Sequence, residues 1–253
     1  MRALARTALL SAFLGVIGIA TPWAPACAPA WAQETPPLPH VYWSFDGPFG
    51  TFDRAAAQRG YQVYKQVCSA CHSMSQMHFR DLSGIGFNDT EIAAIAASVM
   101  VNGKPGKPAD AFPSPFPSLA VAEQTFNGAA PPDMSLMANA FEGGPTFIYA
   151  ILNGFRNPPA GVSVPPGRYY NLYFPGNFIA MPPPLHEGAV QYADGTPASV
   201  EQMAHDVATF LYFVANPHME ERKRIGVRVV LFLVFLTGLT YALKRKVWSD
   251  VEH

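Results

Sequence analysis

The sequence of 253 residues predicts a mainly α-helical domain followed by one C-terminal transmembrane helix. Two observations support this fold class. Segments with apolar residues at helical spacing alternate with stretches rich in proline and glycine, which break regular structure. Near the C-terminus, residues 225–243 are almost entirely apolar, and this run has the roughly 20 residues that a membrane-spanning helix needs.

The overall composition excludes one large class of function. Charged residues make up 14% of the chain and the formal net charge is −1, so the chain lacks the excess of basic residues with which proteins bind nucleic acid. We therefore expect no nucleic-acid partner.

The N-terminus has the pattern of a secretory signal peptide. Two arginines precede the apolar run 8–20, and Ala30-Trp31-Ala32 resembles a cleavage site with small residues. We predict that residues 1–32 are removed, which would also remove Cys27. A retained membrane anchor is the alternative, but the apolar run is short for a span.

The first helix is predicted over residues 54–67, where Gly60, Val63, Tyr64 and Val67 share one face. Residues 74–87 are polar and contain glycine, so we expect a loop there. Asn88 and Glu91 have the spacing of a capping box, and a second helix is expected to run from them to about Val101.

A second group of elements follows the proline-rich loop 102–118. Asp133 is a plausible N-cap for a short turn that reaches Met137. A compact apolar helix is predicted over 146–153, and Gly154 stands where a helix C-terminus favours glycine. Proline and aromatic residues then crowd the segment 157–185, which excludes a central strand or a long helix.

The last helix of the domain is expected to open at Thr196-Pro197 and to stop at Asn216-Pro217, with apolar residues at helical spacing between them. We expect this helix to pack across the first helix, residues 54–67. Gly60 is the residue at which we expect the two backbones to approach each other.

Immediately after the first helix stands Cys68-Ser69-Ala70-Cys71-His72, the C-x-x-C-H pattern for covalent attachment of a c-type haem. Each thiol would add to one vinyl group of the porphyrin, and His72 would become an iron ligand. A redox dithiol and half of a zinc site are the alternatives. The sequence lacks a second C-x-x-C for zinc and lacks the strand and helix context of a thioredoxin-type site.

The second axial ligand decides whether such a haem transfers electrons or binds small molecules. A methionine thioether favours the ferrous state and raises the potential. We predict Met181, because it follows an aromatic-rich segment and precedes Pro182-Pro183-Pro184, which stiffens the chain. Met134 and Met137 are weaker rivals, and Met203 is expected in the core.

The signal peptide and the apolar run together give the predicted organisation. Residues 33–218 form an exported haem domain, 219–224 a juxtamembrane linker, 225–243 the span and 244–253 a cytoplasmic tail. Both flanks of the span are basic, so the orientation rests on export of the N-terminus. In a bacterium this places the haem domain in the periplasm, anchored to the inner membrane by a single span.

Several motifs resemble the cytochrome c1 family, the haem subunits of quinol:cytochrome c reductase (the cytochrome bc1 complex). The resemblance lies in residues 59–73 (RGYQVYKQVCSACHS), 131–135 (PPDMS), 170–176 (YNLYFPG) and 179–185 (IAMPPPL), and in the C-terminal span. It implies a class I cytochrome c-like fold with insertions and one haem c with His72 and Met181 as axial ligands. The sequence departs from the family at Glu142, where many members carry an arginine near the haem propionates.

The resemblance also implies partners. Electrons would come from a Rieske iron-sulfur protein and pass to a soluble cytochrome c, while the span would lie in the bilayer beside a cytochrome b subunit, in a complex that is a dimer. The chain would then be an electron-transfer subunit with no catalytic residues of its own. The alternatives are a free-standing membrane-tethered shuttle and a haem enzyme such as a peroxidase, which needs an open sixth coordination site.

Overall fold

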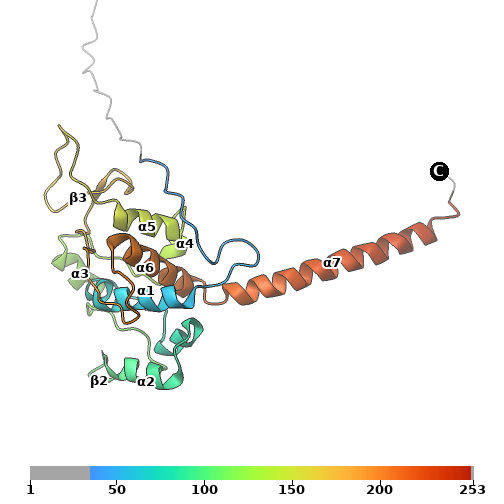
Figure 1. The fold of residues 1–253 in the computed structure, drawn as a ribbon, viewed down its shortest axis with the longest axis horizontal. Helices are drawn as coiled ribbons and strands as arrows, with labels where there is room; N and C mark the ends of the chain where they lie inside the picture. Colours follow the sequence, from blue (N-terminus) through green and yellow to red (C-terminus); the bar gives the residue numbers. More distant parts are fainter. Residues whose placement is uncertain (1–34, 252–253) are drawn as a thin grey trace, which may run out of the picture. The chain divides into compact units, whose positions relative to one another are not determined.

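A computed structural model describes residues 35–251, so the predicted signal peptide and Cys27 lie outside the described part of the chain. This part is mainly helical, as predicted (Figure 1). In chain order the elements are α1 (Arg54–Gln66), η1 (Cys68–Ala70), η2 (Phe79–Ile85), α2 (Asp89–Ala97), β1 (Met100–Val101), β2 (Lys104–Pro105), α3 (Leu119–Thr125), α4 (Met137–Ala140), α5 (Pro145–Asn153), β3 (Tyr169–Tyr170), β4 (Phe178–Ile179), α6 (Val200–Ala215) and α7 (Met219–Val247).

The fold is organised around the crossing of α1 and α6, which lie side by side in Figure 1. Gly60 lies at the crossing point. A β-carbon there would overlap the carbonyl oxygen of Asp206 and would lie 2.7 Å from the β-carbon of Phe210. The predicted close approach at Gly60 is therefore confirmed, and it fixes the position of the helix that leads into the C-x-x-C-H motif.

An ion pair reinforces the same crossing. The guanidinium of Arg59 donates to both carboxylate oxygens of Asp206, at 2.9 and 3.0 Å, and the Asp206 side chain is fully buried. Hydrogen bonding to Asp206 is the main cause that raises the pKa of Arg59. A buried carboxylate is costly unless it is paired, so this contact ties the two helices together in one geometry.

The core lies between these helices and the segment after the motif. Tyr61 and Tyr64 of α1 make edge or tilted ring contacts with Phe210 of α6, and both contact Phe112 from the proline-rich loop. Phe79 of η2 stacks on Phe112 at 4.5 Å. The loop expected as irregular thus contributes an aromatic side chain to the core beside α1.

Within residues 35–251, the strands are two residues long and form two hairpins. β1 pairs with β2 and β3 with β4, both antiparallel. The second hairpin lies inside the proline- and aromatic-rich segment 157–185, which contains no helix, in agreement with the sequence analysis. Asn171 anchors this segment, because its buried side chain donates to the carbonyl of Ile151 at 2.8 Å.

Several predicted boundaries need correction. Residues 74–87 are not a plain loop, since they contain η2, which ends at Gly86 with φ of 100°. Helix α4 begins only at Met137, where the expected turn from Asp133 was to end. Helix α6 begins at Val200, after the N-cap Ser199, and not at Thr196-Pro197. The helix after Asn88 ends at Ala97.

The helix α3 was not predicted. Its sequence gives little signal, because Ala122 is its only buried residue while Leu119 and Val121 are exposed. A helix that buries so small a face lacks the apolar spacing from which helices are recognised.

Helix α7 contains the predicted span. It is long and apolar enough to cross a membrane. It begins at Met219, so residues 219–224, expected as a linker, form the first turns of the same helix. Apart from the half-buried Val227, the apolar side chains of the run are exposed, as expected for a surface that meets lipid.

Candidate functional site

The end of α1 presents the two cysteines. The helix closes at Val67, and the 3₁₀ turn η1 follows directly. Within it, the backbone N–H groups of Cys71 and His72 donate to the carbonyl of Cys68 at 3.1 and 2.9 Å. This tight turn holds both cysteines and the histidine in one short, ordered segment at the end of the rigid crossing of α1 and α6.

Both thiols are free, and both side chains are half-buried. Burial, assisted by the neighbouring Cys71, raises the pKa of the Cys68 thiol to about 12. Cys68 is therefore a neutral thiol at physiological pH. Two adjacent thiols that are neither disulfide-bonded nor fully enclosed fit the attachment of a haem through two thioether bonds.

The half-buried His72 ring is oriented by the backbone of a distant loop. Its Nδ1 lies 2.8 Å from the carbonyl oxygen of Pro132. Since a carbonyl can only accept, Nδ1 carries the proton and Nε2 keeps a free lone pair. Burial lowers the pKa of His72, although the bond to Pro132 and the charge of Asp133 oppose the shift. The imidazole is neutral and ready to ligate a metal through Nε2.

Asp133 holds the loop that carries Pro132. Its carboxylate accepts from the Ser73 hydroxyl and from the backbone N–H groups of Ser75 and Ser135, each at 2.8 Å. The backbone N–H of Met134 also donates to the carbonyl of Ser73. Burial raises the pKa of Asp133, but its hydrogen bonds outweigh that effect and keep the pKa well below its usual range. The loop is thus fastened to the residues just after His72.

The role expected of Asp133 was different. The sequence suggested a helix N-cap, whereas the structure shows a carboxylate that joins the loop 131–135 to the haem motif. The positioning roles of Pro132 and Asp133 were missed. The stretch PPDMS could have indicated these roles. Its two prolines have no backbone N–H and do not continue a helix, and the Asp-x-Ser spacing favours local capping by the aspartate side chain.

Met181 occupies a setting unlike that of the other described methionines near the core. Met74, Met77 and Met203 are buried in the core, and the two rivals Met134 and Met137 pack against it. Met181 is half-buried two residues after β4 and is not part of this cluster. Its thioether is therefore not committed to core packing. Met203 in the core agrees with the sequence analysis.

Arg156 and Arg168 are the candidate substitutes for the propionate-binding arginine that many family members carry where this chain has Glu142. The Arg156 guanidinium donates to the carbonyls of Asn153 and Phe155, at 3.0 and 2.7 Å, and the residue is exposed. Arg168 is exposed as well. Nothing in these contacts selects either side chain for a propionate.

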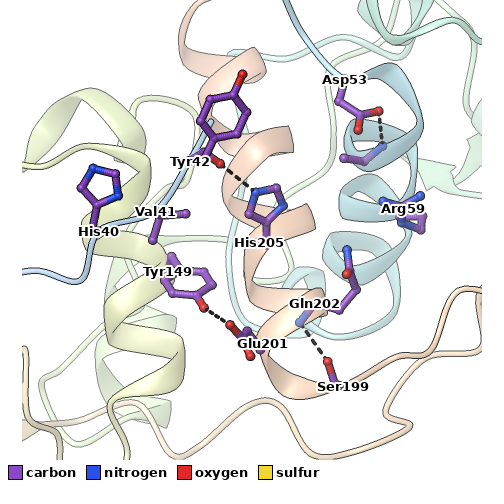
Figure 2. Close-up of a pocket in the computed structure, with 11 residues that line it drawn as sticks. His40, Val41, Tyr42, Asp53, Arg59, Tyr149, Ser199, Glu201, Gln202 and His205 are labelled. Atoms are coloured by element: carbon purple, nitrogen blue, oxygen red, sulfur yellow. Dashed lines mark hydrogen bonds between the residues drawn. The ribbon is translucent and has the colours of Figure 1, made fainter. Parts of the chain in front are cut away.

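A groove of about 490 Å³ lies elsewhere on the domain, where the segment before α1 passes over α6 (Figure 2). Two pairs of its polar groups contact each other: Tyr149 donates to Glu201 at 2.9 Å, and the His205 ring contacts the carbonyl of Tyr42. The residues that line it include none of the cysteines, His72 or Met181. The groove is therefore separate from the haem motif.

Comparison with known proteins settles the family. The Cytochrome C1 family matches residues 43–251, which is most of the chain. The chain belongs to the cytochrome c1 family. This confirms the prediction of a c-type cytochrome, whose cofactor is a covalently bound haem c, in a class I cytochrome c-like domain.

Curated relatives of the cytochrome c1 family match over long stretches. Cytochrome c1 of Rhodospirillum rubrum is 41% identical and covers 83% of this chain and 87% of its own length. "Cytochrome c1-2, heme protein, mitochondrial" of Solanum tuberosum is 42% identical over 94% of both chains. "Cytochrome b/c1" of Bradyrhizobium diazoefficiens is 45% identical over 82% of this chain, which spans only 35% of that protein.

Proposed function

We propose that this chain relays single electrons from a Rieske iron-sulfur protein to a soluble cytochrome c within a quinol-oxidising complex. The observation that carries the proposal is the orientation of His72 by the Pro132 carbonyl, beside two free thiols. This arrangement would supply two attachment points for the porphyrin and one nitrogen ligand for its iron. Haem c, when bound, supplies an iron that changes oxidation state by one electron.

Four residues would hold the cofactor. Cys68 and Cys71 would form the thioether bonds, and His72 Nε2 and the Met181 sulfur would ligate the iron. Because His72 donates its Nδ1 proton to the Pro132 carbonyl, the ring cannot rotate freely, and this bond raises the basicity of Nε2. If His72 and Met181 both ligated the iron, exogenous ligands would be kept from the metal. Such a site favours electron transfer over catalysis on a bound substrate.

The membrane arrangement is part of the proposal. Helix α7 would span the inner membrane once, with the haem domain in the periplasm and residues 244–253 in the cytoplasm. The basic side chains of Lys244, Arg245 and Lys246 at the end of α7 suit a cytoplasmic end. Export would follow from the predicted signal peptide 1–32.

The proposed partners follow from the family. A cytochrome b subunit would lie beside α7, a Rieske protein would donate electrons and a soluble cytochrome c would accept them, within a dimeric complex. The name of the Bradyrhizobium relative, which joins b and c1, supports a close association between such a domain and a cytochrome b. Family membership supports the same set of partners.

The proposal is tested by purification of the tagged full chain in mild detergent. We expect a b-type haem protein and a Rieske centre to co-elute with it, together with quinol:cytochrome c reductase activity. If a lone redox-active c-type cytochrome eluted without these partners, the chain would instead be a membrane-tethered shuttle.

A further inference from the structure

The loop 46–50 is fastened to the base of α7. The Lys223 ammonium donates to the carbonyl oxygens of Phe45, which precedes the loop, and of Gly50, its last residue. One turn earlier, Glu220 accepts from the backbone N–H of Phe52 at 2.8 Å. These contacts hold the loop beside the first turns of α7, where Figure 1 also places this part of the chain.

The Arg54–Glu220 pair extends the same attachment to α1. The Arg54 guanidinium donates to both oxygens of Glu220, at 3.0 and 2.9 Å. This bidentate contact joins the first residue of α1 to the second residue of α7. The base of α7 is therefore tied both to the loop and to the helix that leads to the haem motif.

Burial along α7 shows how far the domain reaches. Met219 is buried, and Lys223 and Val227 are half-buried. These positions are four residues apart and share one face of the helix. The residues 224–226 and 228–230 between and after them are exposed. Burial on this face therefore decreases from Met219 to Lys223 and Val227, and Val227 already belongs to the apolar run 225–243.

Phe49 lies at the exposed end of this attachment. It is 79% exposed, whereas Phe45 and Phe52 on either side of the loop are 3% and 6% exposed and belong to the core. Pro48 is exposed as well. A lone exposed phenylalanine is ordinary on a soluble surface. This one is held next to the residue where a membrane-spanning helix would enter the lipid, since Lys223 precedes Ile225 by only about 3 Å of helix rise.

We propose that Phe49 and Pro48 insert into the boundary between headgroups and acyl chains of the bilayer that α7 spans, so that the domain rests on the phospholipid surface at loop 46–50. The inference rests on the proposed membrane span. Phenylalanine is among the side chains that interfacial segments bury at this depth. The exposed Arg222 and Arg224 would attract lipid phosphates, whereas the exposed Asp46 and Glu221 would repel them. Because these charges offset one another, insertion of the apolar side chains is the main source of the proposed membrane contact.

A nitroxide label measures this depth in the haem-loaded full chain, reconstituted without other proteins in vesicles of zwitterionic and anionic phospholipid. Labels are placed at Phe49→Cys, Tyr42→Cys and Phe232→Cys; with haem attached, Cys68 and Cys71 are blocked as thioethers. Tyr42 is the control because it is 80% exposed on the same segment but outside the loop. Phe232 is the control for the span.

The measured quantity is the accessibility of each label to oxygen, which partitions into lipid, relative to a water-soluble nickel chelate. We expect the ratio at position 49 to be about threefold or more above that at position 42, and below that at position 232. Equal ratios at positions 49 and 42, with position 232 buried in lipid, would overturn the proposed insertion of Phe49 and leave the proposed membrane span intact.

Two other outcomes are distinct. A water-accessible label at position 232 would overturn the proposed span itself. Protection of position 49 that required co-purified membrane proteins would assign Phe49 to a protein partner and would likewise overturn the lipid contact.

Discussion

The Nδ1 atom of His72 lies 2.8 Å from the carbonyl oxygen of Pro132, sixty residues further along the chain. This bond fixes the tautomer of the histidine and leaves Nε2 free to ligate. The Pro132 carbonyl is held in turn by the neighbouring Asp133, whose carboxylate binds Ser73 and Ser75. The orientation of the expected iron ligand thus depends on a loop that contains no ligand itself.

The first prediction concerns Asp133→Ala. Loss of the carboxylate leaves the Ser75 and Ser135 N–H groups without their acceptor, so we expect a loss of stability of about 2 kcal/mol. A loosened Pro132 loop weakens the bond from His72 Nδ1, lowers the basicity of the ligand and should raise the haem potential. Thermal unfolding and a redox titration measure the two effects.

The control is Asp110→Ala, which removes a carboxylate that accepts one backbone N–H, that of Lys107, on another loop. It should leave the potential unchanged. If both variants shifted the potential equally, Asp133 would have no specific effect on His72.

The second prediction concerns Met181→Leu. If the Met181 sulfur is the axial ligand, its loss should lower the potential, abolish the far-red sulfur-to-iron absorption band and allow cyanide to bind the oxidised haem quickly. Met203→Leu is the matched control, because Met203 is fully buried in the core. Met203→Leu should lower the free energy of unfolding by less than about 1.5 kcal/mol and keep the absorption band. A band that survived in Met181→Leu would assign the ligand to another residue.

The third prediction concerns Gly60→Ala at the crossing of α1 and α6. The new methyl group would meet the backbone of Asp206, which cannot move without separating the helices. We expect a loss of stability of about 1–3 kcal/mol or more. Gly226→Ala makes the same change in α7, where a β-carbon meets open space, and should be neutral or slightly stabilising. If thermal unfolding gave the same change in melting temperature for Gly60→Ala and Gly226→Ala, the close approach at Gly60 would make no contribution to stability.

The fourth prediction concerns pH. The hydrogen bond from Arg54, opposed by burial and aided by the N–H of Phe52, lowers the pKa of Glu220 in the folded chain. Its stabilising contribution is therefore complete above the unfolded value of about 4.3 and declines as the pH falls through that value towards the folded pKa. Glu220→Gln should be less stable than the parent at neutral pH by about 1 kcal/mol, and the difference should shrink in acid.

Thermal melts at about pH 7 and about pH 3.5 measure this difference. Glu221→Gln is the control, since exposed Glu221 has only a 3.6 Å contact with His218. A gap between parent and Glu220→Gln that stayed constant across this range would contradict the assigned role of the Arg54–Glu220 pair.

Much of the architecture could be predicted because it rests on local signals. The capping box of Asn88 and Glu91, the glycine after α5 and the apolar run of α7 all occur where the sequence placed them. Gly60 could be predicted as well, since a glycine on the buried face of a helix has few other reasons to be there.

The missed features depend on contacts between distant residues. Asp133 looked like a helix cap because its partners Ser73 and Ser75 lie some sixty positions away. Phe112 lay in a loop dense in proline, and only the folded chain brings it against Tyr61 and Phe79. The attachment of loop 46–50 to Lys223 joins the two ends of the domain, and no local sequence pattern predicts it.

The central claim, that this haem carries each electron from the Rieske centre to cytochrome c, is tested most directly by rapid mixing. The purified oxidised complex is mixed with quinol and soluble cytochrome c, and the absorbance of the c1-type haem is followed. We predict that this haem is reduced before the soluble cytochrome c and is then reoxidised by it. Met181→Leu should impair the first step, because a lower haem potential weakens the driving force for electron transfer from the Rieske centre. Reduction of soluble cytochrome c at the normal rate while this haem stayed oxidised throughout would contradict the account.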